Sequence, residues 1–379
     1  MAKRAIFEEV GTAQRPAAQG GVIDAAARRG DRGAVRAWLA ILFGLVVAMI
    51  AVGGLTRLTD SGLSITEWRP VTGALPPLSA EAWDAEFEKY RAIPEYRLQN
   101  RGMSLSEFQT IYWWEWGHRQ LGRVIGLVWL VGLVGLWATK KIPPGWHGRL
   151  IGIGALGGLQ GAIGWWMVSS GLTGTMLDVA SYRLATHLGL AFVILSLIAW
   201  FMLSLSRREA ELIQARRSRD VRMAPWGAVL IGAVLFQILW GALVAGIDAG
   251  RNYTDWPLMA GGLTPPGMWE LQPWWRNLFE NDGTVQFFHR LFGYATLALV
   301  LAAWWRARSS PLRSVRSAFT GVMHMTWLQI ALGIVTVMHS SPWYLAIVHQ
   351  FGAVVLIVLA VRARHRALYP LPQSVRATA

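Results

Sequence analysis

Eight long apolar runs constrain the fold of this chain more than any other feature of its sequence. Each is close to the length, about 20 residues, that an α-helix needs to cross a bilayer. The chain is 54% hydrophobic and only 15% charged, whereas soluble domains carry about a quarter charged residues. We therefore expect an all-α integral membrane protein with eight transmembrane helices. The runs are 37–56, 118–139, 150–168, 184–206, 223–247, 284–305, 317–338 and 343–361.

The charged residues between the runs predict which helix ends face the cytoplasm. Basic residues dominate one set of segments, and acidic residues are frequent in the other set, which contains the long loops 57–117 and 248–285. Under the positive-inside rule, the basic set is cytoplasmic. The formal charge of +14 is then a topology signal and gives no reason to expect nucleic acid as a partner. Both termini are predicted to be cytoplasmic, as tails at 1–36 and 363–379, with a cytoplasmic linker at 207–222.

The chain also contains an internal repeat. Residues 53–77 match residues 241–265, because glycine, aspartate, threonine, tryptophan and proline recur 188 positions later. This predicts a four-helix bundle used twice, at 37–206 and 223–362. Four spans return the chain to its starting side, so the two units are expected to be parallel repeats. Later matches pair His118-Arg119 with His289-Arg290, Leu159-Gln160 with Leu328-Gln329, and His187 with His349.

Four of the eight histidines recur in the repeat, each near the start of an even-numbered span. Even-numbered spans run from outside to inside, so all four imidazoles are expected near the outer surface. Two facing imidazoles inside a four-helix bundle are the usual way to hold a six-coordinate haem. A glycine or alanine at i+4 lies on the same face and leaves room for a flat macrocycle. The four pairs are His118 with Gly122, His187 with Ala191, His289 with Gly293, and His349 with Ala353.

Other interpretations of the histidines remain open. A zinc or copper site is weaker than haem, because the chain has no cysteine and no His-x-x-x-His pair to complete a compact site. Any single histidine near a helix end can also be a polar interface residue. The four remaining histidines do not recur: we expect His147 and His365 to be solvated in inner loops, and His324 and His339 to be structural.

Glu115 distinguishes the two halves. It precedes His118 by three residues, so both can share a helix face, whereas Gln286 holds the matching position before His289. If both halves bind haem, this difference predicts a substrate haem in the first half and a resident haem in the second. The alternative is that Glu115 only forms an exposed ion pair with Arg119. Candidate partners for haem propionates, which otherwise snorkel to the interface, are Arg57, Arg119, Arg123 and Arg290.

Between about residues 37 and 362 the chain resembles the haem A synthase family. The resemblance rests on Gly-Gly-Leu-Thr-Arg-Leu-Thr-Asp-Ser-Gly-Leu-Ser-Ile-Thr-Glu-Trp at 53–68 and on the histidine motifs at 115–119, 186–188, 288–290 and 348–350. The absence of cysteine resembles the proteobacterial and mitochondrial branch. The resemblance implies oxidation of the C8 methyl group of haem O, through an alcohol, to the formyl group of haem A for terminal oxidases. It also implies a location in the cell inner membrane, with both haem sites toward the periplasmic side.

The resemblance assigns roles to individual residues. It implies that Glu115 is the catalytic glutamate, that His118 and His187 surround the substrate haem O, and that His289 and His349 are the axial ligands of a resident haem b. Side chains alone cannot oxidise a methyl group, but a nearby carboxylate can take a proton or stabilise a developing cation. Expected partners are haem O and membrane lipid. A haem O synthase, oxidase assembly factors, an unidentified electron acceptor or donor, and a second copy of the chain are further candidates.

Two other functions share part of this pattern. A di-haem b-type cytochrome that passes electrons between quinone and a partner would also show paired histidines, but would more naturally stack its haems across the membrane. A transporter with parallel repeats would show broken helices near mid-membrane, and the only interruption of that kind is the Ser340-Ser341-Pro342 break between the last two runs.

Overall fold

The protein is described by a computed structural model over residues 30–174 and 176–373. Apart from one isolated antiparallel bridge between Met259 and Gly262, the regular secondary structure of these residues is helical. Eight helices are long and apolar enough to span a membrane, which confirms the predicted class. They are α2 (Arg32–Leu58), α5 (Leu105–Ala138), α6 (His147–Val168), α7 (Ser181–Leu205), α9 (Met223–Gly246), α11 (Asp282–Ala307), α12 (Arg313–Met338) and α13 (Trp343–Leu368).

Several helices extend beyond the apolar runs that predicted them. The helix α5 begins 13 residues before 118, because Ser104 caps its first turn: its side chain accepts from the Glu107 amide, and Glu107 accepts from the Ser104 amide in return. Asp31 caps α2 in a similar way, and α13 continues to Leu368. The predicted tail boundaries near 36 and 363 therefore fall inside helices, and the predicted linker 207–222 contains the short helix α8 (Glu209–Arg217).

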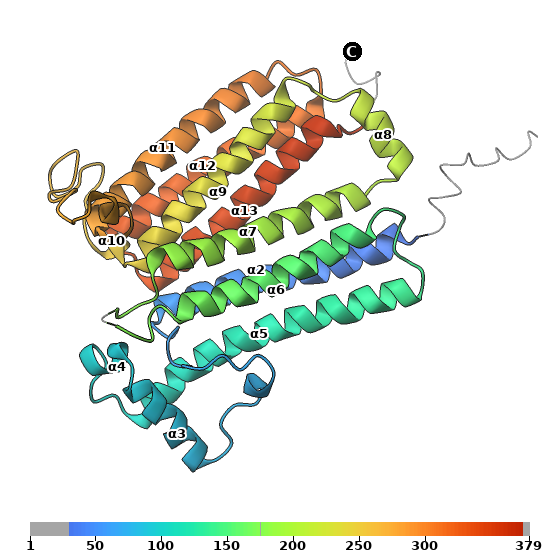
Figure 1. Ribbon diagram of the computed structural model, residues 1–379. Coiled ribbons are helices and arrows are strands. Elements are labelled where there is room, and N and C mark those ends of the chain that lie inside the picture. The colour runs from blue at the N-terminus through green and yellow to red at the C-terminus, as the bar shows by residue number, and fades with distance from the viewer. Residues whose placement is uncertain (1–29, 175, 374–379) are drawn as a thin grey trace, which may run out of the picture.

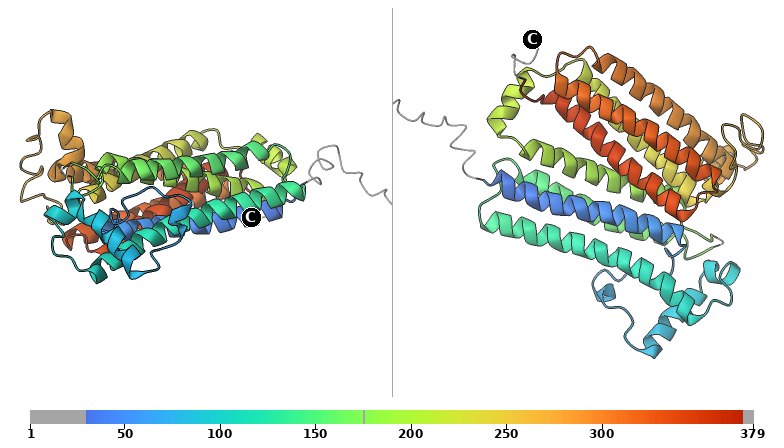
Figure 2. Two further views of the ribbon diagram at one scale, coloured as in Figure 1. Left: turned by 60° about the horizontal axis from the view of Figure 1, so that its bottom comes forward. Right: turned by 180° about the vertical axis from the view of Figure 1, so that it is seen from behind.

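The eight spans form two neighbouring rings of four (Figures 1 and 2). In the first ring, α2 contacts α5 and α7, and α6 contacts the same two helices. In the second ring, α9 contacts α11 and α13, and α12 contacts the same two. The rings meet where α7 lies against α9 and α13, and where α2 lies against α13. This arrangement agrees with two four-helix bundles, and the symmetry of the repeat stays a prediction.

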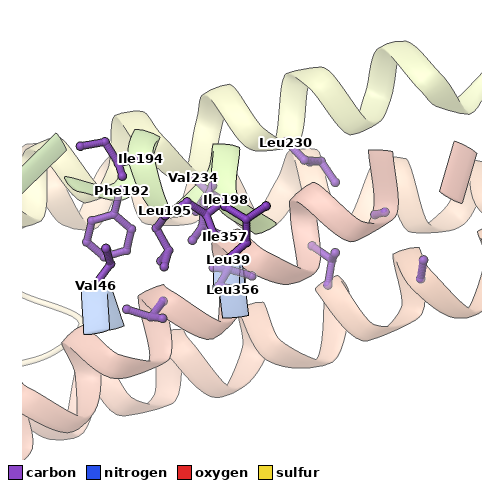
Figure 3. Close-up of a cluster of buried hydrophobic side chains, with 14 of the residues drawn as sticks. Leu39, Val46, Phe192, Ile194, Leu195, Ile198, Leu230, Val234, Leu356 and Ile357 are labelled. Carbon is purple, nitrogen blue, oxygen red and sulfur yellow. The ribbon is translucent and has the colours of Figure 1, made fainter. Parts of the chain in front are cut away.

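The helix halves nearer α8 are joined by a continuous apolar core. Figure 3 shows side chains from both rings meeting there, with Leu39 and Val46 on α2, Leu195 and Ile198 on α7, and Ile357 on α13. In a bilayer, where lipid is as apolar as these side chains, close van der Waals packing stabilises such contacts. Because the core fills the helix halves nearer α8, open space remains mainly in the halves nearer the long loops.

The long first outer loop folds onto the outer part of α5. It contains α3 (Ala80–Arg91) and α4 (Pro94–Leu98), where Tyr90 of α3 is fully buried against Phe108 of α5. The second outer loop contains the short α10 (Asn277–Glu280). In Figure 1 these loop helices lie at one end of the bundle, and α8 lies at the other end with the start of α2 and the end of α13.

His365 corrects one expectation. It was expected to be solvated, but it is 1% exposed and packs between the rings of Trp200 and Tyr369. The apolar run ends at residue 361, but α13 continues for two further turns and keeps this face against α7. Solvation was inferred from the neighbouring arginines, and this inference failed because a helix separates its faces every few residues.

Candidate functional site

A single cavity of about 930 Å³ reaches both rings. All four recurring histidines line it, as do Glu115 and Gln286. The small residues predicted to leave room below the imidazoles, Gly122, Ala191, Gly293 and Ala353, also line it. His147, His324, His339 and His365 do not, so the repeat separates the cavity histidines from the others.

Each cavity histidine lies against a glycine of a neighbouring helix. A Cβ atom added to Gly53 of α2 would lie 3.1 Å from Nε2 of His118, and one added to Gly241 of α9 would lie 3.1 Å from Cε1 of His289. On α6 and α12, the corresponding distances are 2.9 Å for Gly164 to His187 and 3.0 Å for Gly333 to His349. Larger residues at these positions would displace the imidazoles. The sequence places these glycines in the repeat blocks, but it does not indicate which side chains they contact.

The geometry of His289 and His349 fits a shared haem iron. Their ring centres are 6.4 Å apart and their planes are nearly perpendicular, at 82°. Two imidazoles bound to one metal have ring centres roughly 6 Å apart, because each metal–nitrogen bond is about 2 Å and the ring centre lies about 1 Å further. The donor set, the separation and the glycine clearances are therefore compatible with a six-coordinate haem.

Three of the four histidines are held by a glutamine. The amide nitrogens of Gln160, Gln237 and Gln329 donate to the backbone carbonyls of His187, His289 and His349 at 2.8–2.9 Å, and lie 3.1–3.2 Å from their Nδ1 atoms. These bonds attach the helix turn that carries each histidine to the neighbouring helix.

His118 differs from the other three histidines. The position equivalent to Gln237 is Met49. Met49 lies 3.5 Å from a Cβ placed on Gly122, and Gln237 lies 3.4 Å from a Cβ placed on Gly293. The histidine beside Glu115 thus has a thioether where its counterpart has an amide. Sequence reasoning missed this difference, although the 188-residue offset would have shown it.

Glu115 is buried in a shell of hydrogen-bond donors. Its carboxylate is 2% exposed. Ser64 Oγ and the Ile65 amide each donate to Oε2 at 2.7 Å, and Arg119 donates to Oε1 from Nη2 at 2.6 Å and from Nε at 3.1 Å. The predicted pair with Arg119 is therefore present, but the carboxylate is buried and has two further donors. Three residues thus donate four hydrogen bonds to its two oxygens.

Gln286 occupies the matching position in the second ring with a different set of partners. Its amide donates to the carbonyls of Ala249 and Asn252 at 2.7 and 2.6 Å, and its own carbonyl accepts from Arg290 at 2.8 Å. The loop around Gln286 therefore presents acceptors where the loop around Glu115 presents donors. This difference in surroundings matches the difference between an amide and a carboxylate.

The four candidate propionate partners all line the cavity. Arg119 also donates to the carbonyls of Ile65 and Glu67, and Arg290 donates to those of Tyr253 and Asp255, which are the same loop positions 188 residues later. Both arginines thus attach the outer loop to its helix.

The other two candidates have different partners. Arg57 contacts Asp60, Asp248 and Asp178 at 2.8, 3.0 and 3.4 Å, which links the two rings. Arg123 donates to the carbonyls of Pro70 and Arg69, both at 2.9 Å. In this structure each of these arginines already has protein partners.

A second buried carboxyl group lines the same cavity. Glu95 of α4 is 3% exposed, accepts from Asn100 at 3.3 Å through Oε1, and has no partner for Oε2 among the described residues. Burial, together with the nearby charge of Asp178, raises the pKa of Glu95 to about 8. Sequence reasoning missed this group, because Glu95 lies in the part of the first loop that has no counterpart in the second half.

Comparison with known proteins identifies the family. Residues 36–361 match the family model described as "Cytochrome oxidase assembly protein" (COX15-CtaA). Within the described residues, no cluster of three or more histidine, aspartate or glutamate side chains forms a compact metal site. A protein of Dinoroseobacter shibae named "Heme A synthase" is 66% identical over 376 residues, covering 99% of this chain and 98% of that protein. Proteins of the same name from Jannaschia sp. and Paracoccus denitrificans are 63% and 55% identical over 380 residues, with 99–100% of each chain covered. This chain therefore belongs to the COX15-CtaA family of cytochrome oxidase assembly proteins.

Proposed function

We propose that this protein is a haem A synthase, which oxidises the C8 methyl group of haem O to a formyl group. The proposal is supported by full-length similarity to proteins named "Heme A synthase". The observation that carries it is local: a buried carboxylate surrounded by donors, Glu115, lines the same cavity as His118 and His187. The second ring has the histidines but has an amide in place of the carboxylate, so the first ring is the proposed substrate site.

In this proposal the two rings have different tasks. His289 and His349 would hold haem b, which supplies one-electron redox chemistry when bound. His118 and His187 would bind the substrate haem and fix its orientation in the outer half of the first ring.

The surroundings of Glu115 favour one of the two roles left open by the sequence. Four hydrogen bonds from Ser64, Ile65 and Arg119 hold both oxygens of the Glu115 carboxylate, so the group is fixed in place. We propose that Glu115 acts as a fixed negative charge that stabilises positive charge developing on the substrate during C–H oxidation. The proton would then leave by another group that faces the cavity.

The orientation follows from charge. The basic segments, including α8, lie at the end opposite the outer loops (Figure 1). The positive-inside rule then favours cytoplasmic termini and haem sites toward the periplasmic side of the cell inner membrane.

The pigment content of the purified protein tests this function. We expect haem O and haem A together with haem b in the wild-type protein, and haem b without haem A in Glu115→Ala, measured by extraction and mass spectrometry. Haem b alone, reducible by quinone in both sites, would identify a di-haem cytochrome. Undiminished haem A in Glu115→Ala would show that Glu115 has only a structural role, as an ion-pair residue.

A further inference from the structure

The cavity extends further toward the inner side in the first ring than in the second. In the first ring its deepest lining residues are Leu42, Leu130, Ile153 and Ile198, on α2, α5, α6 and α7. At the positions equivalent by the repeat, the lining of the second ring ends about one turn earlier on each helix, at Val234, Thr296, Thr326 and Leu356. One helical turn is about 5.4 Å. The extension is apolar, and it is continuous with the part of the cavity that contains Glu115.

The extension also opens sideways between α5 and α6. Gly126 of α5 and Gly157, Gly158 and Gly161 of α6 line the cavity, are exposed, and have no atom within 4 Å of an added Cβ. We call these four glycines the α5–α6 seam. An exposed glycine that lines the cavity presents no side chain that would close the gap between α5 and α6, so the seam lets the cavity reach the hydrocarbon region.

The same seam is closed in the second ring. The residues equivalent to Gly126, Gly157 and Gly161 are Leu297, Thr326 and Ile330, each with a side chain where the first ring has none. Thr326 is 3% exposed, and Trp327, the counterpart of Gly158, is 50% exposed but adds a large side chain. At the described residues, side chains thus fill this boundary in the second ring and leave it open in the ring with the carboxylate.

This difference between the rings matches the difference between the two haems of the proposed function. Haem O carries a long isoprenoid side chain that haem b lacks, and such a chain needs an apolar channel at least as long as itself or an exit into lipid. From the structure we infer that the α5–α6 seam and the extension behind it are the binding site and membrane entrance for the isoprenoid tail of the substrate haem. The inference rests on the proposed function, since it requires a tailed haem at His118 and His187.

The test transfers the residues of the second ring to the first. Gly126→Leu combined with Gly157→Thr closes the seam without changing a histidine or Glu115. Gly135→Leu with Gly148→Thr is the matched control, because both glycines lie on the same two helices with open space around them but outside the cavity. Full-length protein loaded with haem b, in lipid nanodiscs, is titrated with haem O and, separately, with haem B, and binding is followed by Soret absorbance.

We expect the seam variant to bind haem O at least roughly ten-fold more weakly than wild type, because the added side chains would clash with the tail. Haem B binding should stay within roughly two-fold, and the control should match wild type. If both haems weaken together, or neither changes, the inference is wrong; a lipid chain in the extension would give the second result. Retained haem b in the second ring shows that the variant is folded, and if it is lost, the single variants Gly126→Leu and Gly157→Thr are measured instead.

This outcome can be separated from failure of the proposed function. If wild-type protein makes haem A and the seam variant still prefers haem O, only the tail site is wrong. If wild-type protein neither prefers haem O over haem B nor makes haem A, the proposed function itself fails.

Discussion

A comparison of Glu115 with Gln286 distinguishes the structural role of this position from a chemical one. Both side chains are 2% exposed, and both connect a helix to its outer loop and to the arginine four residues later. Gln286 makes these connections without a charge, so holding the loop does not require a carboxylate. The negative charge of Glu115 is better explained by the reaction than by the fold.

Glu95 predicts a pH dependence of stability. Its pKa is raised from 4.5 to about 8 in the folded protein, so the folded state binds the proton more tightly than the unfolded state. The free energy of unfolding should therefore fall as pH rises from about 4.5 to about 8, by at most about 1.4 kcal/mol per pH unit, and then stay level. Glu95→Gln, which is neutral at every pH, should remove this decline and raise the Tm at pH 9 relative to wild type.

Thermal unfolding of detergent-solubilised protein between pH 5 and pH 9 measures the effect of Glu95. Glu88→Gln is the control, because Glu88 lies on α3 of the same outer loop but is exposed. Equal pH slopes for wild type and Glu95→Gln would show that Glu95 is ionised in the folded protein.

The residues that sequence reasoning found are those that recur. The four histidines and Glu115 stood out because each has a counterpart or a changed counterpart in the repeat, and the structure brings all five to one cavity. Glu95 was missed because its burial depends on how α3 and α4 fold onto α5.

At the element scale, the approach of neighbouring helices to the histidines depends on single glycines. Gly333→Val on α12 should displace His349, since even a Cβ atom would lie 3.0 Å from its ring. Overpacking of this kind costs about 1–3 kcal/mol, so we expect haem b content to fall by roughly ten-fold. Haem extraction and absorbance of the purified protein provide the measurement.

The same helix offers a control. Gly321 of α12 has open space around it, and Gly321→Val should retain haem b. Equal haem b content in the two variants would mean that Gly333 does not position His349.

Helix boundaries show where hydropathy stops being informative. The apolar run of α5 predicts a start at residue 118, whereas the helix starts at Leu105. The first turns are polar and aromatic, and they are helical because Ser104 caps them and the outer loop covers Phe108 and Tyr112. As a result, Glu115 and His118 lie in the middle of a rigid helix and not at its frayed end.

At the scale of the whole molecule, eight spans and their grouping into two bundles followed from the sequence, because length, hydropathy and repetition determine them. The contacts between the rings did not follow. Arg57 pairs with Asp60 and joins the rings through Asp178 and Asp248, which lie 121 and 191 residues further along the chain. The depth of the cavity likewise depends on side-chain volumes on four helices together. The division of labour between the rings therefore remains the central proposal.

Two single variants test this division most directly, by the identity of the haem that each loses. We expect His118→Ala to keep haem b and to lack haem O and haem A, and His289→Ala to lose haem b, when pigments from equal amounts of purified protein are identified by mass spectrometry. Loss of the same haem from both variants, or loss of haem b from His118→Ala with haem A still formed, would contradict separate substrate and resident sites.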